Sequence, residues 1–344
     1  MGSFVHLHVH SSYSVLDGMS SISGLVDKAV KSGMHALALT DHGNMFGIKE
    51  FYNVCKKKNG PLKDKITVLE RKLKDPETGE EEKEAIRKEI ELTKLKMIKP
   101  IFGSEVYVAQ RSRYDKEDKG DRSGYHLVLL AKNETGYRNL CRLVSNGWIQ
   151  GFYYRPRIDH DLLAKYSEGL IATSACLGGE IHKNIEAGDL AAAERAILWY
   201  KKVFGDDYYL ELQRHKTDKP GADTQTYVKQ ELQNKELIAL ARKTNTKLIA
   251  SNDVHFVEED HADAHEHLIC LSTGKDLDDP TRMRYTKQEW LKTPEQMAEI
   301  FADIPECLEN TLEIASKVEF FKLESAPMMP VFPIPAEFGT EEDY

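Results

Sequence analysis

Three histidines that alternate along one short apolar segment are the first residues that could do chemistry. His6, His8 and His10 are spaced two apart, so a strand would place all three side chains on one face. Imidazoles in this arrangement can converge on one cation. The alternative is that they are ordinary surface or core histidines, which can have the same spacing. The segment therefore indicates a candidate metal site that needs further ligands from elsewhere in the chain.

Two later apolar runs each end in an aspartate and a histidine. Asp41 and His42 follow the second run of the chain, and Asp253 and His255 follow the last one. Such pairs supply oxygen and nitrogen ligands, and at strand ends they would lie at the rim where barrel enzymes place their sites. Their recurrence favours a shared metal centre over scattered histidines.

Four more residues with metal-ligating side chains lie near the ends of other apolar runs: Asp17, Glu105, His126 and Cys176. An inward carboxylate at Glu105 would be costly to bury unless it were paired or bound a metal. The alternative for Asp17 is an ordinary Asp-Gly turn, and the alternative for Cys176 is a small buried cysteine. Together these side chains could hold two or three ions. Cysteine and histidine favour zinc, while carboxylates also admit manganese or iron.

The elements that must position these residues follow from the apolar pattern. Amphipathic helices are expected over residues 22–32, 133–144, 189–204 and 226–243. Strand and helix thus alternate, which predicts parallel βα units and an α/β barrel with its chemistry at the carboxyl ends of the strands. The seven expected strands cover residues 4–9, 35–40, 100–108, 125–131, 169–174, 208–212 and 247–251.

Two segments interrupt this alternation. Residues 56–99 are dense in charge and predict an inserted helical hairpin with its turn at 75–79, exposed to solvent on its charged faces. After residue 275 no strand pattern is present; Thr293 begins a capping box ahead of one helix, and another is expected over 306–318. We therefore expect one domain over residues 1–275 and the truncated helical, proline-rich start of a following region over 276–344.

Composition excludes several classes of protein. The 344 residues are 41% hydrophobic, which suffices for a sizeable core, and no run approaches the roughly 18 apolar residues of a membrane span. Five scattered cysteines argue against a disulfide framework and for a reduced, cytoplasmic protein. With a net charge of −9, any contact with nucleic acid must come from a local basic patch.

One short segment offers such a patch. Arg155 and Arg157 follow three consecutive aromatic residues at 152–154. Guanidinium groups grip phosphate and aromatic rings stack on bases, so these arginines are the candidate phosphate ligands. The alternative is an ordinary surface loop.

The motifs around these residues resemble one known family. His8-x-His10, Asp41-His42-Gly43, Glu105, His126, Cys176 and Asp253-x-His255 are similar to those of the polymerase and histidinol phosphatase (PHP) family. The strings at 4–18, 40–47, 151–159, 174–181 and 251–256 resemble the PHP domains that open the alpha subunits of bacterial DNA polymerase III. The resemblance runs from about residue 4 to residue 332, apart from 56–99. It implies a distorted seven-stranded (β/α) barrel with a trinuclear metal site.

The resemblance also implies how the ligands are shared among three divalent ions, zinc or manganese, with iron also an option. His8, His10, Glu105 and Asp253 would hold the first ion. Glu105 would bridge to a second ion completed by His126 and Cys176, and Asp17, His42 and His255 would hold the third. Only His126 fits poorly, because it lies at the start of its expected strand instead of the end.

Four other histidines are expected to lie outside the centre. The family pattern aligns only the later two histidines of the first segment, which leaves out His6. His261 and His265 are four residues apart in a helical stretch that also holds His267. No glutamate follows the first of the pair as in an HExxH zinc motif, so these three are expected to be structural.

The family implies one function, with two alternatives. We expect metal-dependent hydrolysis of phosphodiesters at a DNA 3′ end, in a parent that is a DNA-directed DNA polymerase; this chain lacks the polymerase palm. Expected partners are single-stranded or primer–template DNA, the rest of the polymerase chain and other replisome subunits, with no membrane. One alternative is a catalytically silent, metal-braced scaffold that stabilises the polymerase and docks a proofreading subunit. The other is a small-molecule phosphatase such as a histidinol phosphatase.

Overall fold

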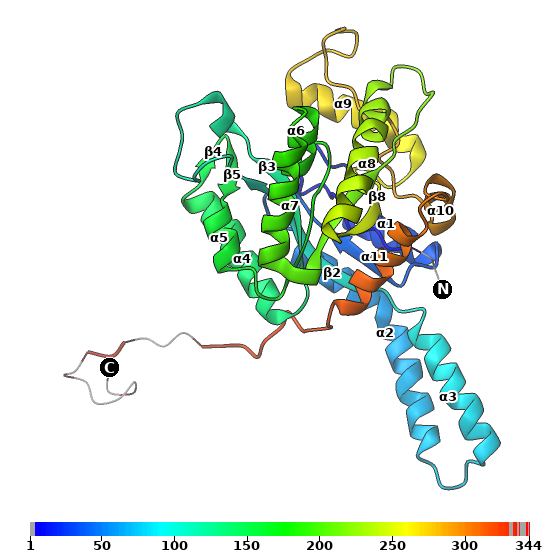
Figure 1. The fold of residues 1–344 in the computed structure, drawn as a ribbon. Helices are drawn as coiled ribbons and strands as arrows, with labels where there is room; N and C mark the ends of the chain where they lie inside the picture. Colours follow the sequence, from blue (N-terminus) through cyan, green and yellow to red (C-terminus); the bar gives the residue numbers. More distant parts are fainter. Residues whose placement is uncertain (1–3, 330–332, 336, 338–341, 343) are drawn as a thin grey trace.

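A curved mixed sheet forms the centre of the molecule, and helices pack around it (Figure 1). The computed structural model describes residues 4–329, 333–335, 337, 342 and 344. Within this part eight strands share one sheet: β1 (Ala36–Leu39), β2 (Lys99–Val108), β3 (Tyr125–Ala131), β4 (Phe152–Tyr153), β5 (Arg155–Ile158), β6 (Leu170–Thr173), β7 (Tyr208–Gln213) and β8 (Lys247–Ser251).

The sheet follows the order β4-β5-β2-β3-β6-β7-β8, with β1 paired to β2 in parallel. The strands at 36–39 and later form where the sequence predicts them, and β4 and β5 are an additional edge hairpin that the apolar pattern did not indicate. The expected (β/α) barrel is thus confirmed in a distorted form, as a curved mixed sheet that includes this short edge hairpin.

The expected first strand, residues 4–9, is an extended segment without a regular ladder, which corrects the prediction. It runs between β1 and the exit of β8, where Ala38 N donates to His6 O at 2.9 Å and Val254 N donates to His8 O at 3.2 Å. The ladder is broken because Val5 N donates to the Thr311 hydroxyl at 3.1 Å instead of to a strand. Even so, the segment bridges the gap between β1 and β8.

Strand β3 runs antiparallel to both of its neighbours, β2 and β6. Only a loop with the short 3₁₀ turn at Lys119–Arg122 joins β2 to β3, so the chain returns without the helical crossover that parallel pairing needs. The first residues of β3 therefore lie at the same rim as the carboxyl ends of β1, β6 and β8. This direction explains why His126, at the start of its strand, still reaches the predicted site.

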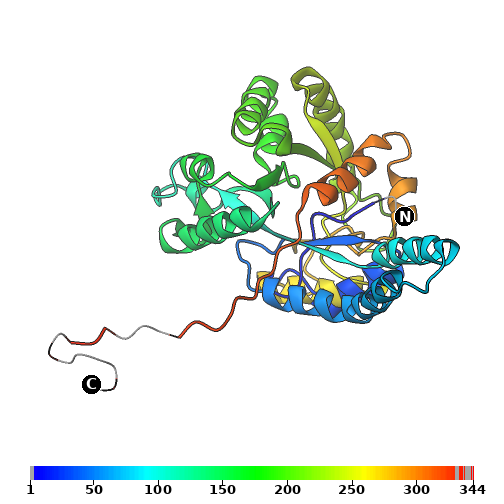
Figure 2. The same ribbon diagram turned by 90° about the horizontal axis from the view of Figure 1, so that it is seen from below.

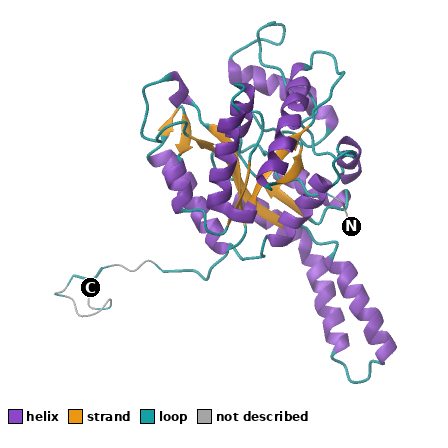
Figure 3. Cartoon of the chain, viewed as in Figure 1, coloured by secondary structure: helices purple, strands orange, loops and turns teal. Residues whose placement is uncertain are grey.

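Helices cover the outside of the sheet (Figures 2 and 3). Side chains of Ser21, Asn133 and Asp189 accept hydrogen bonds from the first turns of three helices and set where these begin. None of the described helices is long and apolar enough to cross a membrane. The surrounding helices are α1 (Ile22–Lys31), α4 (Glu134–Ile149), α5 (His160–Lys165), α6 (Glu180–Glu186), α7 (Leu190–Phe204), α8 (Gln225–Thr244) and α9 (Ala262–Thr273), with 3₁₀ turns at Lys119–Arg122, Gly205–Asp207 and Glu259–His261.

Helices α10 (Pro294–Ile300) and α11 (Glu306–Lys317) pack into the same cores as the barrel. The predicted capping box of α10 is present at Thr293 and Gln296. Ile314 of α11 joins a buried cluster with residues near the amino ends of the parallel strands, among them Ala36 and Ile101. Helix α11 therefore closes the end of the barrel opposite the rim that holds the predicted ligands. The division expected after residue 275 stays a prediction about the longer protein.

The inserted hairpin projects from the barrel as α2 (Ile48–Leu73) and α3 (Glu80–Lys94) (Figure 1). Helix α2 begins fourteen residues before the expected position 62, because Phe51 and Cys55 are buried in the main core. The two ends of the hairpin lie close together, since Asn59 Nδ2 donates to Ile98 O at 2.8 Å and Ile98 N donates back to Asn59 Oδ1 at 3.0 Å.

We expect that the outer part of this hairpin can be removed without loss of the barrel. Its own small core of Leu69, Ile86 and Ile90 is separate from the main cores. Replacing residues 62–95 by a short glycine–serine loop should leave zinc binding unchanged and shift the thermal midpoint by no more than about 4 °C.

Phe51→Ala serves as the control, because it removes a buried ring from the main core and should cost about 3–5 kcal/mol. Loss of cooperative unfolding in the shortened chain would show that the outer hairpin supports the barrel.

Candidate metal centre

Nine residues predicted from the sequence as ligands gather at one rim of the barrel. They come from separate segments: the extended segment and its loop, the exits of β1, β6 and β8, the middle of β2 and the start of β3. Most of them line a cavity of about 720 Å³. The gathered residues are His8, His10, Asp17, His42, Glu105, His126, Cys176, Asp253 and His255.

Glu105 lies at the centre of this group and is almost completely buried. Its Oε1 atom lies 2.9 Å from His126 Nδ1 and 3.4 Å from His8 Nε2, with Cys176 Sγ at 3.8 Å. Its Oε2 atom lies 2.5 Å from His42 Nδ1. Burial alone would raise the pKa of Glu105, but His126, His42 and His8 hold this pKa well below its usual value. One carboxylate thus faces ligands on two sides.

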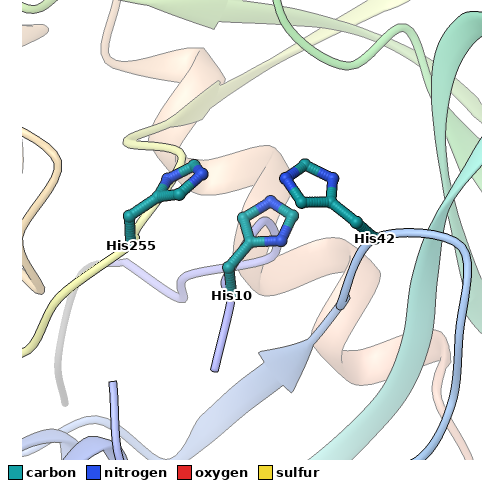
Figure 4. Close-up of side chains that lie close together, drawn as sticks. All are labelled: His10, His42 and His255. Carbon is teal, nitrogen blue, oxygen red and sulfur yellow. The ribbon is translucent and has the colours of Figure 1, made fainter. Parts of the chain in front are cut away.

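A second carboxylate, Asp253, completes the deep part of the group. Its Oδ1 atom lies 3.3 Å from Nε2 of both His8 and His10, and 3.7 Å from His255 Nδ1. The rings of His10 and His255 lie 4.5 Å apart between centroids, and both point toward the same space as His42 (Figure 4). Burial, together with the neighbouring histidines His42 and His255, lowers the pKa of His10 to about 3.

Asp17 joins the group from the more exposed side. Its Oδ2 atom lies 2.9 Å from His42 Nε2 and 3.8 Å from His255 Nε2. The Tyr285 hydroxyl donates to Asp17 Oδ1 at 2.6 Å, and His265 Nε2 bonds to Asp17 O at 2.8 Å. Burial would lower the pKa of His255, but the hydrogen bond and charge of Asp17 raise it to about 9.

The residues fit divalent cations, because their inward atoms are left without hydrogen-bond partners. Buried polar atoms almost always have a hydrogen-bond partner, so a group of unsatisfied polar atoms around one space is unusual. Three subsets have ligand atoms within 4.8 Å of one another: His8, His10 and Glu105; Glu105, His126 and Cys176; and His10, His42 and His255. The atoms without a hydrogen-bond partner include His8 Nε2, His10 Nε2, Asp253 Oδ1 and His255 Nε2. His42 Nδ1 and Glu105 Oε2 also make no aligned hydrogen bond, although they lie 2.5 Å apart.

Glu211 on β7 supports the centre and was missed by the sequence analysis. Its carboxylate accepts from His8 Nδ1 at 2.7 Å, from the Thr173 hydroxyl at 2.6 Å and from Gln213 Nε2 at 3.0 Å. The first bond fixes the His8 ring with Nε2 toward the cluster, as carboxylates do behind metal-bound histidines. A charged residue inside an apolar strand is the signal that could have found it.

Asp41 takes a supporting position instead of the ligand position that the sequence suggested. It accepts from Ser11 N at 2.7 Å and from the Ser14 hydroxyl at 2.7 Å. Ser14 Oγ in turn lies 2.9 Å from His10 Nδ1. The aspartate is satisfied by these donors, so it orders the loop behind His10 and does not face the shared space.

The two candidate phosphate ligands separate in the structure. Arg155 is exposed and lines the cavity. Arg157 is fully buried, and its guanidinium donates to the backbone carbonyls of Gly151, Arg113 and Asp115 at 2.8–3.1 Å. It holds loops together and cannot reach a phosphate, which corrects the expectation for this residue.

Histidines expected outside the cluster do lie outside it. His6 Nε2 bonds to Lys292 O at 2.8 Å, and His6 belongs to none of the three subsets. His261 caps a short turn at Glu258, and His267 bonds to the backbone of Asp263. His265 is buried beside the centre, where it holds the backbone of Asp17.

Backbone strain is concentrated around the centre. Leu16, Ala175 and Asp253 have φ values of +62°, +58° and +45°, in the left-handed region that non-glycine residues rarely adopt. Each is a candidate ligand or immediately precedes one. Such strain persists only where surrounding contacts impose it, and it is typical of functional sites.

Known proteins resemble this chain over most of its length. Residues 6–215 match the PHP domain family. The chain is 42% identical over 344 residues to DNA polymerase III subunit alpha of Borreliella burgdorferi, covering 99% of this chain and 26% of that protein. It is 38% identical over 354 residues to DNA polymerase III subunit alpha of Campylobacter jejuni, covering 100% of this chain and 25% of that protein.

The chain therefore spans about a quarter of the length of these curated relatives. Among solved structures, a candidate metal-dependent phosphoesterase from Bifidobacterium adolescentis is 12% identical, with a TM-score of 0.37 over 73% of this chain and 87% of that one.

We expect Glu211→Gln to weaken metal binding without unfolding the barrel. The amide keeps the size of the side chain but loses the charge that orients His8. Zinc or manganese affinity, measured by competition with a chromophoric chelator, should fall about 10- to 100-fold.

Glu180→Gln is the matched control, because the Glu180 carboxylate contacts His160 at 3.0 Å and Tyr200 at 2.8 Å and bonds to none of the nine candidate ligands. Its metal affinity should equal that of the wild type. A folded Glu211→Gln protein with unchanged affinity would contradict the supporting role.

Proposed function

The chain belongs to the PHP domain family, and from this premise we propose that it is the PHP domain of a bacterial DNA polymerase III alpha subunit that hydrolyses phosphodiester bonds at DNA 3′ ends. The observation that carries this proposal is the set of unpartnered, buried ligand atoms at the floor of a cavity open to solvent. Its proposed partners are DNA, the rest of the polymerase chain and other replisome subunits in the bacterial cytoplasm.

Three divalent ions, zinc or manganese, are proposed for the centre. His8, His10, Glu105 and Asp253 would hold one, Glu105 with His126 and Cys176 another, and Asp17, His42 and His255 the third. His10 is also close enough to His42 and His255 to contribute to the third group. When bound, divalent ions at such a centre polarise the phosphate and lower the pKa of a water molecule, so no serine or cysteine nucleophile is needed.

The chain's own residues prepare this chemistry by holding charge in fixed positions. Three carboxylates, Glu105, Asp253 and Asp17, supply negative charge that cations would balance. Burial and the nearby carboxylate of Glu105 raise the pKa of the Cys176 thiol well above its usual value. A bound cation is therefore what would make Cys176 a thiolate ligand.

The scaffold alternative is favoured by one feature of the same centre. Its ligands come from segments that lie far apart in the chain, from His8 to His255, and the deepest ones are almost completely buried. Ions held there would link the strands of the barrel even if no substrate were cleaved. Activity measurements separate the two proposals.

We expect Asp253→Asn combined with His255→Ala to strip metal and abolish hydrolysis. Both residues follow β8 instead of lying in its core, so the barrel should remain folded. Loss of ions that supply several kcal/mol of transition-state stabilisation should lower the shortening of a labelled single strand at least about 10³-fold. Elemental analysis should show the accompanying loss of metal.

His261→Ala combined with His267→Ala is the control, since these histidines lie outside the cluster. It should retain both metal and activity. If wild-type protein loaded with manganese or zinc never shortens a 3′ end, the scaffold proposal replaces the exonuclease proposal.

We expect Arg155→Ala to weaken binding of single-stranded DNA while metal content stays constant. Removal of one phosphate contact should reduce the slope of log affinity against log salt by about one unit. Arg138→Ala is the control, because Arg138 is 70% exposed and pairs with Glu134 on an outer helix. Equal salt slopes for Arg155→Ala and wild type would exclude a phosphate contact at Arg155.

A further inference from the structure

One wall of the cavity beside the metal centre is aromatic. Trp148, Phe152 and Tyr154 line it together with the candidate ligands, and their exposed fractions are 43%, 46% and 62%. They belong to the end of α4 and to the β4–β5 edge hairpin (Figure 1). Large exposed rings gathered at a cavity mark a surface that binds a ligand.

Two of these rings form an ordered pair. Trp148 and Phe152 stack with centroids 5.3 Å apart and planes 12° from parallel. The indole Nε1 of Trp148 donates to Gly43 O at 2.8 Å, and Gly43 directly follows the candidate ligand His42. The aromatic pair is therefore fixed to the same turn that presents His42, which sets its position relative to the centre.

Cationic groups lie over two other aromatic rings of the same cavity, Tyr107 and Tyr154. The guanidinium of Arg155 lies 5.6 Å from the centre of the Tyr107 ring, and that of Arg122 lies 5.1 Å from the Tyr154 ring. Tyr154 also has a φ of +62°, so its exposed ring is held at a cost in backbone strain. Aromatic faces next to guanidinium groups are the combination that binds single-stranded nucleic acid without regard to sequence.

We propose that Trp148 and Phe152 form a stacking platform for the unpaired bases next to the 3′-terminal phosphodiester of single-stranded DNA. The inference rests on the proposed exonuclease function and names the form of its substrate. Stacking needs a free base face, so a frayed end would be bound and a fully paired end would not. The platform distinguishes such a strand from a small phosphomonoester, which has no base to stack.

The test measures binding in EDTA, so that no hydrolysis contributes. A labelled oligothymidylate is compared with the same strand whose last two nucleotides are abasic. Wild type should prefer the complete strand by about 5- to 150-fold for each base that stacks, the range that stacking on aromatic side chains gives. Phe152→Ala should reduce this preference toward unity, and Phe152→Tyr should retain it.

Ile149→Ala is the matched control, because Ile149 is 82% exposed and adjacent to Trp148 but is not among the described residues that line the cavity. It should keep the full preference. As a second readout, the complete strand should quench tryptophan fluorescence in wild type but not in Trp148→Phe, which leaves Trp199 and Trp290 in place.

An equal affinity of wild type for complete and abasic strands would overturn the platform, as would an unchanged preference in Phe152→Ala. The outcome is separate from that of the exonuclease proposal. A base preference without cleavage would support the platform and contradict the exonuclease proposal. Cleavage without any base preference would support the exonuclease proposal and contradict the platform.

Discussion

Burial of the Glu105 carboxylate at the rim of the barrel is the constraint on which the rest of the centre depends. An unpaired buried charge costs several kcal/mol, so the surrounding segments must bring compensating groups to it. His8, His42 and His126 come from three different segments and keep the carboxylate ionised. The reversal of β3 matters for this reason, since it brings His126 to the rim from the opposite chain direction.

A further set of polar groups holds the rings of His8 and His10 in place. Glu211 accepts from the far nitrogen of His8, and Ser14 contacts the far nitrogen of His10 while donating to Asp41. Nε2 of His8 and Nε2 of His10 thereby face the shared space without a hydrogen-bond partner. These bonds fix the orientation of the rings, and the left-handed backbone at Ala175 and Asp253 lies in the same region.

The residues that gather at the rim could be predicted from aspartate and histidine at the ends of apolar runs together with the resemblance to the PHP family, and most strands and helices could be predicted from their periodicity. Other features depend on contacts that a sequence does not display. The extended segment at 4–9 loses its ladder to the Thr311 side chain. Arg157 is buried where its guanidinium donates to the nearby carbonyl of Gly151 and to the distant carbonyls of Arg113 and Asp115. Helix α2 begins before its expected start because Phe51 packs into a core to which elements elsewhere in the chain also contribute.

The closure of the barrel by α11 has a kinetic consequence. Ile314 and its neighbours fill the end opposite the rim, so the interior has a floor as well as walls. Among the described residues, the centre meets solvent through the cavity, past Asp17 and His126, its more accessible members. The exchange rate of a deeply held ion is thus governed by the motions of the loops at the mouth, and affinity alone does not determine its residence time.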